Sequence, residues 1–417
     1  MKKNSLFTVS LLSAFISLSC YAHQDVTLNA DSLSDARVSV SDDTGKTQVE
    51  VINTNQDNIA HIYYDRFDVS DDGLLLKNDK AELIINEVVS KKRSMLEGEL
   101  ELQGKKATVV IANPNGISCN NCSFSGFTES NSIKLITGSS TGKFSKQFTL
   151  TDELIDFRFT DKLTKNEFSH INRHYKNISS RKINIISNHV LLANGDFNAE
   201  YIRFDLGLTK FNLKDKNIYN KRASLDISKE AELNSRNLII AGYNSSVSNR
   251  GDINTLSLIA AVDYWENNDR ASISINTDDN LYRTPYDDMK KSKLIVSGYY
   301  FGSDKSSFDI KNSKLDIYAD TMYLDKYFTI DNSYLIADVN DLNVFNITLK
   351  QSYFDITAQN DINIDGKIEG EGRVVLEGNG GNFNDKGKIA LTGKGSAGLK
   401  GQPKFKLGTS NIIYKGN

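Results

Sequence analysis

Residues 112–122 read Ala112-Asn113-Pro114-Asn115-Gly116-Ile117-Ser118-Cys119-Asn120-Asn121-Cys122, and they follow the apolar run Val109-Val110-Ile111. A residue before proline is pushed out of the α-helical region, so Asn113 stays extended and the preceding strand cannot continue as a helix. Asn, Pro, Asn and Gly in this order fit the four positions of a type I turn. The segment therefore predicts a β-strand that ends in a rigid corner at Asn113, Pro114, Asn115 and Gly116.

The N-terminal segment 1–22 has the features of a secretory signal peptide. Lys2 and Lys3 precede an apolar core from Leu6 to Leu18, and the small residues Cys20 and Ala22 stand at the positions favoured before cleavage. The apolar core is shorter than the about 20 residues that a membrane-spanning helix needs. We therefore expect residues 1–22 to be removed during export, with lipid attachment at Cys20 as the alternative.

The chain has three cysteines, and Cys119 and Cys122 remain once the leader with Cys20 is removed. In an oxidising compartment such a pair can form a disulfide and keep it. A redox pair would instead follow a βαβ strand at a helix start, and a zinc site would need two further ligands. A structural disulfide that braces the turn is our interpretation, and the redox pair and the zinc site are the alternatives.

The exported chain is expected to be weakly acidic. Loss of Lys2 and Lys3 leaves 48 basic and 53 acidic residues, a net charge of about −5. This balance gives no reason to expect nucleic acid or an anionic membrane as the main partner.

No residue pattern points to catalysis, a cofactor or a metal. His170 and His174 have helical spacing within the best helical candidate, residues 161–175, but the glutamate of a metalloprotease is missing beside His170. Acidic doublets fall in turn-like segments, where aspartate is favoured for local hydrogen bonds. We therefore expect a protein that is not an enzyme. The doublets are Asp42-Asp43, Asp71-Asp72, Asp278-Asp279 and Asp287-Asp288.

Internal repetition predicts the architecture. Four similar segments begin with serines that are 21, 20 and 19 residues apart. Units of this size, with strands too short to bury a face alone, must stack on their neighbours, which predicts an all-β parallel β-helix. At about 20 residues per turn, the 395 residues after the leader would make roughly 19 turns. The segments are Ser292 to Val296, Ser313 to Ile317, Ser333 to Ala337 and Ser352 to Ile356.

Residues 112–122, together with strand-like segments on both sides, resemble the secretion domain of two-partner secretion exoproteins, the filamentous haemagglutinin and haemolysin group. Leu135-Ile136-Thr137-Gly138 stands where this family usually has Leu-Thr-Thr-Gly. One departure is that Asn78 continues through Asp79-Lys80-Ala81 without the family's earlier Asn-Pro-Asn-Leu turn. The resemblance covers roughly residues 25 to 140. Its other segments are 51–53, 61–69, 73–78, 84–88 and 94–102.

The resemblance implies a right-handed parallel β-helix with an N-terminal cap and small extra-helical strands. It divides the chain into a signal peptide at 1–22, a two-partner secretion (haemagglutination activity) domain at 23–250, and a β-helix continuation with glycine-rich coils at 251–417. It also implies secretion to the cell surface or the medium through a dedicated outer-membrane pore. The pore would recognise the N-terminal domain in the periplasm. The candidate recognition motif is Asn113, Pro114, Asn115 and Gly116.

An adhesin, directed at a host-cell or neighbouring-cell surface, is the first interpretation of the exported rod. The alternatives are a haemolysin or toxin-type exoprotein, a truncated remnant of a longer one, and a β-helix enzyme that cleaves polysaccharides. Trp265 and the tyrosines of 63–64, 299–300 and 323–327 either line a carbohydrate or protein contact face or pack in the β-helix core.

Overall fold

The computed structural model describes residues 25–128, 130–160, 182–268, 271–276, 291–303, 307–324, 327–378, 383–384, 387–392, 396–401 and 412–415. The expected leader, the helical candidate with its two histidines, and the doublets at 278–279 and 287–288 lie outside these residues. In the described part, η1 (Ala30–Ser32) is a single 3-10 turn, and no helix there is long and apolar enough to cross a membrane.

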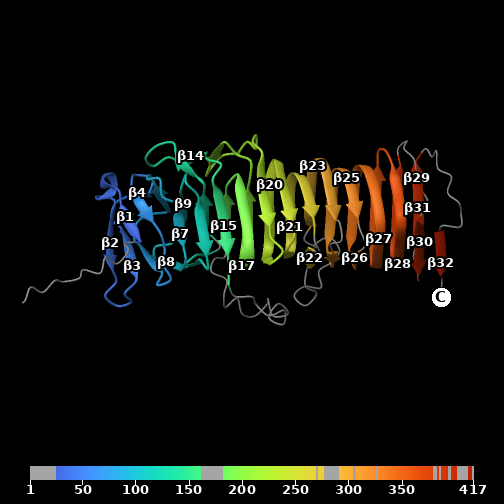
Figure 1. The fold of residues 1–417 in the computed structure, drawn as a ribbon, viewed down its shortest axis with the longest axis horizontal. Helices are drawn as coiled ribbons and strands as arrows, with labels where there is room; N and C mark the ends of the chain where they lie inside the picture. The colour runs from blue at the N-terminus through green and yellow to red at the C-terminus, as the bar shows by residue number, and fades with distance from the viewer. Residues whose placement is uncertain are drawn as a thin grey trace, which may run out of the picture.

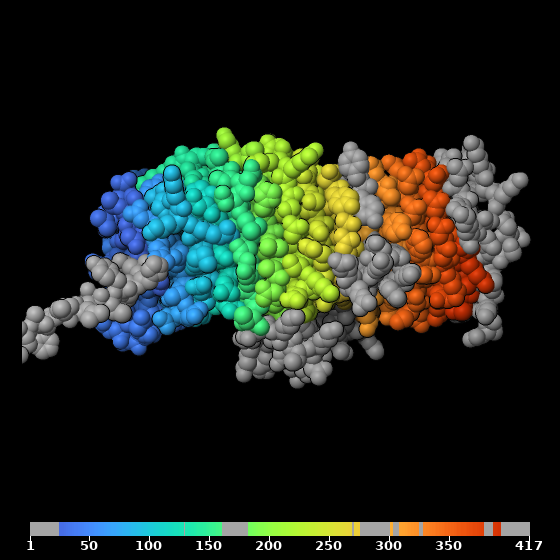
Figure 2. All heavy atoms as spheres, in the orientation of Figure 1, coloured from blue at the N-terminus to red at the C-terminus, as the bar shows by residue number. Residues whose placement is uncertain are grey.

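Successive strands wind into a β-solenoid of about 12 turns, which confirms the predicted parallel β-helix. Figure 1 shows the strands stacked one after another along the long axis, from the N-terminal to the C-terminal end. Figure 2 shows the same order on the surface, where the colours follow one another along the rod. Neighbours in space are therefore mostly successive turns of the chain.

Each turn contributes to three parallel faces, which we call A, B and C in chain order. Face A begins with β4 (Ile59–Phe67), β6 (Leu83–Val88), β9 (Thr108–Ala112), β12 (Ile133–Ile136) and β16 (Lys182–Ile186), and later includes β31 (Ser396–Gly401). Face B includes β7 (Ser94–Leu96), β10 (Ile117–Asn120), β15 (Leu154–Arg158), β19 (Ala223–Ile227) and β29 (Phe383–Asn384).

Face C includes β22 (Ser272–Asn276), β24 (Ser307–Lys311), β26 (Tyr327–Asp331), β30 (Lys388–Thr392) and β32 (Ile412–Lys415). In the first turns its place is taken by a separate sheet of β2 (Ala36–Val40), β3 (Thr47–Val51), β5 (Leu74–Asn78), β8 (Glu99–Gly104) and β11 (Ser123–Ser125). Long strands bend around corners and join two or three faces. They are β17 (His189–Asp205), β20 (Ala231–Asn249), β21 (Asp252–Asn267), β23 (Lys291–Ser303), β25 (Lys314–Leu324), β27 (Tyr334–Ala358) and β28 (Ile362–Gly378).

The solenoid has fewer turns than the sequence estimate of roughly 19. On face A, Ile59 pairs with Leu83, and further along Ile133 pairs with Ile183, so the early turns are long and differ widely in length. Only in later turns does the spacing of paired residues shorten to that of the serine repeat, as where Leu315 on β25 pairs with Leu335 on β27. The estimate is too high because it extends the short late period over the whole chain, and excursions in the longer early turns reduce the number of turns, as expected for this kind of rod.

Three of the four repeat serines form a buried ladder at the corner between faces C and A. The backbone N–H of Ser313 donates to Ser333 Oγ at 2.9 Å, and the N–H of Ser333 donates to Ser352 Oγ at 3.1 Å. The preceding residues, Asn312 and Asn332, have φ values of 49° and 44°, a left-handed conformation that asparagine tolerates. Ser292 is out of register with this ladder.

The register explains why Ser292 is an exception. Its Cα partner on β25 is Leu315 and not Ser313, so the turn between them is longer than the sequence spacing of the serines suggests. The interior is mainly apolar and aromatic. The Phe301, Phe308 and Phe328 rings follow one another at 5.7 and 4.9 Å between centroids, and Trp265 is fully buried.

Antiparallel strands are confined to the early turns of the described chain. β1 (Val26–Leu28) pairs antiparallel with β4, and β2 with β3. Outside face A, β13 (Gly138–Ser140), β14 (Gln147–Leu150) and β18 (Lys210–Asn212) form a three-stranded antiparallel sheet. Phe148, Leu150 and Phe211 from this sheet pack on outward side chains of face A and form a second hydrophobic cluster. These elements correspond to the expected cap and extra-helical strands.

We predict that Ser333→Ala destabilises the solenoid, because Ser333 Oγ accepts the Ser313 N–H and donates to Asp331 O at 2.6 Å while fully buried. Loss of both hydrogen bonds should lower the free energy of unfolding by about 1–3 kcal/mol, measured by urea unfolding of the full chain. Thr348→Ala, at an exposed position on face C, is the control. Equal midpoints for the two variants would show that the ladder contributes nothing.

Candidate functional site

The predicted turn lies at the corner between β9 on face A and β10 on face B. The backbone N–H of Gly116 donates to Asn113 O at 3.2 Å, which closes the turn. Asn113 is fully buried, and its side-chain Nδ2 donates to Lys92 O at 2.9 Å and to Ser94 Oγ at 3.0 Å. Asn113 thus joins its own corner to the corner of the preceding turn.

Asn115 adds a second connection to the same preceding corner. Its Nδ2 donates to Ser90 O at 2.8 Å and to Asn113 Oδ1 at 3.1 Å. Asn113 Oδ1 also accepts the backbone N–H of Asn115 at 2.8 Å. The two asparagine amides are therefore engaged inside the protein.

Pro114 and Gly116 contact the following corner. Pro114 O accepts a hydrogen bond from Thr151 Oγ1 at 2.9 Å. Gly116 has a φ of 95°, and a Cβ there would lie 2.8 Å from Leu154 O. The guanidinium of Arg93 donates to Leu154 O at 2.9 Å and forms an ion pair with Asp156, so it ties the corners before and after the turn together.

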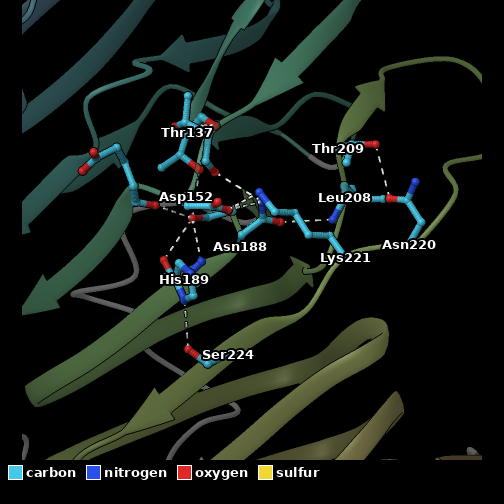
Figure 3. A network of polar contacts seen from close by, with 12 residues as sticks. Thr137, Asp152, Asn188, His189, Leu208, Thr209, Asn220, Lys221 and Ser224 are labelled. Carbon is cyan, nitrogen blue, oxygen red and sulfur yellow. Dashed lines mark hydrogen bonds and ion pairs between the residues drawn. The ribbon is translucent and has the colours of Figure 1, made fainter.

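The polar contacts continue along this edge of the rod, as Figure 3 shows from Thr137 to Ser224. The N–H of Thr151 donates to Thr137 O at 2.9 Å, and Thr137 Oγ1 donates to Ser187 Oγ at 2.9 Å. The buried Asn188 donates to Asp152 Oδ1 at 3.1 Å and accepts from the N–H of Leu208 at 3.1 Å. We call this stack the corner column: residues 90–94, 113–116, 137, 151–152 and 187–188.

The sequence predicts only part of the corner column: residues 113–116, the segment that begins at Ser94 and the segment that contains Thr137. In the structure Asn113 contacts Ser94, and both Pro114 and Thr137 contact Thr151. Thr151, Asp152 and Asn188 were not predicted. Asn188 had a usable signal, because it follows the isoleucine-rich, strand-like segment 183–187 as Asn113 follows the strand-like segment 108–112. Thr151 and Asp152 had none.

Cys119 and Cys122 are joined by a disulfide in the structure. Both are buried, and between them Asn121 has a φ of 58° and donates its N–H to Arg158 O at 2.8 Å. A closed loop this small removes little conformational entropy from the unfolded chain, so the disulfide adds little stability by that route. Its main effect is on the shape of the bend after β10. The described residues contain no group of three or more His, Cys, Asp and Glu side chains that could hold a metal.

A charged cluster lies on the outer side of face A beside the corner column. Asp205 accepts from Arg203 Nε at 2.8 Å and from the Tyr219 hydroxyl at 2.6 Å. The pKa of the nearby Lys134 is lowered to about 8, mainly by burial; Asp205 opposes the shift, and Lys182 and Arg203 add smaller decreases. With the Asn184 amide turned so that its oxygen faces Lys134, that oxygen lies 2.7 Å from Nζ.

A family model described as the TPS secretion domain matches residues 25–255. Among curated proteins, the 16S rRNA endonuclease CdiA of Enterobacter cloacae is 34% identical over 117 residues, 22% of this chain and 3% of that protein. The hemolysins of Serratia marcescens and Proteus mirabilis are 31% and 32% identical over 23% and 31% of this chain, and 7% and 9% of their own lengths. The matched part is thus less than a tenth of each of these relatives.

Two solved structures are similar over most of the chain. The filamentous hemagglutinin secretion domain is 14% identical, with a TM-score of 0.37 over 91% of this chain and 100% of that one. The HMW1 secretion domain from Haemophilus influenzae is 15% identical, with a TM-score of 0.48 over 91% of this chain and 99% of that one.

We predict that Gly116→Ala disturbs the corner column, because the new Cβ meets Leu154 O at 2.8 Å and φ is positive. The free energy of unfolding should fall by about 1–3 kcal/mol in urea unfolding. Gly45→Ala is the matched control, since Gly45 has a φ of 70° but nothing within 4 Å of its added Cβ. An equal loss in both variants would mean that backbone conformation alone, and not the close approach, accounts for the effect.

The lowered pKa of Lys134 predicts a pH dependence of stability. Between about 8 and the ordinary value of 10.5, the unfolded chain binds a proton at this position that the folded chain has lost. Stability should therefore rise with pH across this window and show no such rise below it. From pH 7 to 10, the urea midpoint of the wild type should rise relative to that of Lys134→Met, which has no group that titrates at this position. If the midpoints of the two proteins changed in parallel with pH, the lowered pKa of Lys134 would be contradicted.

Proposed function

Because the chain belongs to the family of proteins with a TPS secretion domain, we propose that it is an adhesin exported by two-partner secretion. Exoproteins with this domain cross the outer membrane to the cell surface or the extracellular space, and the domain implies a cognate outer-membrane transporter. The family match, over residues 25–255, is the observation that supports export by this route.

We infer that the transporter recognises the motif 113–116 before the chain folds. In the folded protein Asn113 is fully buried, and the Nδ2 atoms of Asn113 and Asn115 donate to Lys92, Ser94 and Ser90. A partner could not use those groups without opening the corner. In the unfolded chain the same segment is free to add to an exposed sheet edge of the transporter through its backbone.

Folding outside the cell then supplies a direction for export. Every new turn finds its hydrogen-bond partners and its apolar neighbours on the turn that has already emerged. Backward movement would require that stacked turns separate again. Export in this mechanism needs no ATP.

The adhesin role is supported by the elongated shape of the exported part (Figure 2), which can hold a contact surface away from the cell. A haemolysin is the second candidate, because two of the relatives are hemolysins. The two functions differ in a simple assay. A haemolysin lyses red cells when it is secreted with its transporter, whereas an adhesin attaches to cells and leaves them intact.

We predict that the mature chain reaches the culture medium only when the transporter is expressed with it, and that Asn115→Ala reduces this export severalfold because the recognition segment is altered. Immunoblots of medium and periplasm measure the effect. Asn120→Ala, on β10 but outside the corner column, is the control. Export of Asn115→Ala at the wild-type level would show that this side chain has no role in recognition.

A folding defect would give the same loss of export, so the refolded variants are also compared by protease digestion. Wild-type protease resistance of Asn115→Ala together with poor export supports recognition. Lost resistance means that the side chain acts through folding of the corner. Export without the transporter would contradict the two-partner route itself.

A further inference from the structure

The outer side of face A differs between the two halves of the rod. In the early turns, side chains of β14 and β18 cover it. In the later turns it carries four of the ten exposed large hydrophobic side chains found in the described residues. They are Ile259, Tyr318, Ile336 and Tyr353, with exposed fractions of 41, 44, 38 and 39%.

Three of these side chains lie together on β25 and β27, with a fourth aromatic ring beside them. The rings of Tyr334 and Tyr353 are stacked, with centroids 4.3 Å apart and planes at 11°. The ladder places Tyr318 beside Asp338, and Asp355 beside Val375. We call this surface the tyrosine face: Tyr318, Tyr334, Ile336, Asp338, Tyr353 and Asp355.

Carboxylates stand between the apolar groups of the tyrosine face. Asp338 and Asp355 are both exposed. The centre of a protein–protein interface is normally depleted of charged residues, because a buried carboxylate without a cationic partner loses its hydration. A protein partner that covered this face would bury both carboxylates. The composition of the face therefore does not favour a protein partner.

A sugar fits the same arrangement of groups. Its hydroxyls can donate hydrogen bonds to carboxylate oxygens, which only accept, while its C–H surface packs on exposed aromatic rings. Lys314 and Arg373 flank the tyrosine pair in the ladder, beside Tyr334 and Tyr353, and offer donors to sugar oxygens. Lys314 is already paired with Asp316 at 3.5 Å, beside Ile336, so the carboxylates of the face outnumber its cations and would repel a sugar that carries a negative charge.

We propose that the tyrosine face binds neutral oligosaccharides, an inference that rests on the proposed adhesin function and names its ligand class. The face is part of an open sheet, so each copy buries little of its ligand and binds weakly. Many copies on one cell would bind a glycan-covered surface much more strongly through avidity.

The test uses the full chain refolded from denaturant and a panel of immobilised neutral oligosaccharides, each paired with its sialylated form. We expect binding to neutral members, and roughly tenfold weaker binding by Tyr353→Ala and by Tyr318→Ala, as for loss of an aromatic hot spot. Tyr243→Ala removes a tyrosine that is 47% exposed elsewhere on the rod, and it should bind as the wild type does. Circular dichroism checks that the variants fold.

Several results would overturn the proposal: no binding to any neutral oligosaccharide, preference for the sialylated forms, or unchanged binding by both tyrosine variants. Cell attachment that depends on Tyr353 but survives enzymatic removal of surface glycans would indicate a protein partner instead. A chain that attaches to cells but binds no oligosaccharide keeps the adhesin function and loses the glycan inference. A chain that attaches to no cells loses the adhesin function itself, and neither outcome depends on export.

Discussion

Backbone hydrogen bonding between successive turns is the constraint on which the whole structure depends. No strand of the solenoid can satisfy its own N–H and C=O groups, and a single turn cannot bury its apolar side. Both needs are met only by the turns above and below. The first turn has a neighbour on one side only, and the antiparallel contacts of β1 with β4 and of β2 with β3 lie at that end. The architecture is thus a direct result of incomplete units that complete one another.

Corners are where stacking is hardest, because the chain must turn sharply while its polar groups remain buried. The described residues show two arrangements, one at the corner between faces C and A and the other at the corner between faces A and B. In the later turns a left-handed Asn or Gln followed by a buried Ser recurs from turn to turn, with Ser313 bonded to Ser333 and Ser333 to Ser352. In the early turns the corner column uses different residues at each level, held by Asn113, Thr151 and Asn188. The irregular solution coincides with the residues that match the secretion-domain family.

The two halves also differ in what lies outside face A. Over the early turns the sheet of β13, β14 and β18 covers apolar side chains such as Ile85 and Val110. Over the later turns the outward positions carry tyrosines and aspartates that face solvent. Export and attachment therefore have separate places in the proposal: the early turns belong to the family domain, and the later turns offer a contact surface.

The sequence by itself determined the parallel β-helix and the position of the corner at residues 113–116. A serine period near 20 and the order Asn113-Pro114-Asn115-Gly116 are local patterns, and local sterics and strand length decide what they form. The number of turns, the contacts of Thr151 and Asn188 with that corner, and the outward direction of Tyr318 and Tyr353 were decided only by the tertiary structure. Each of these depends on register between segments that lie one whole turn or more apart in the chain. Excursions of variable length change that register without leaving a periodic signal in the sequence.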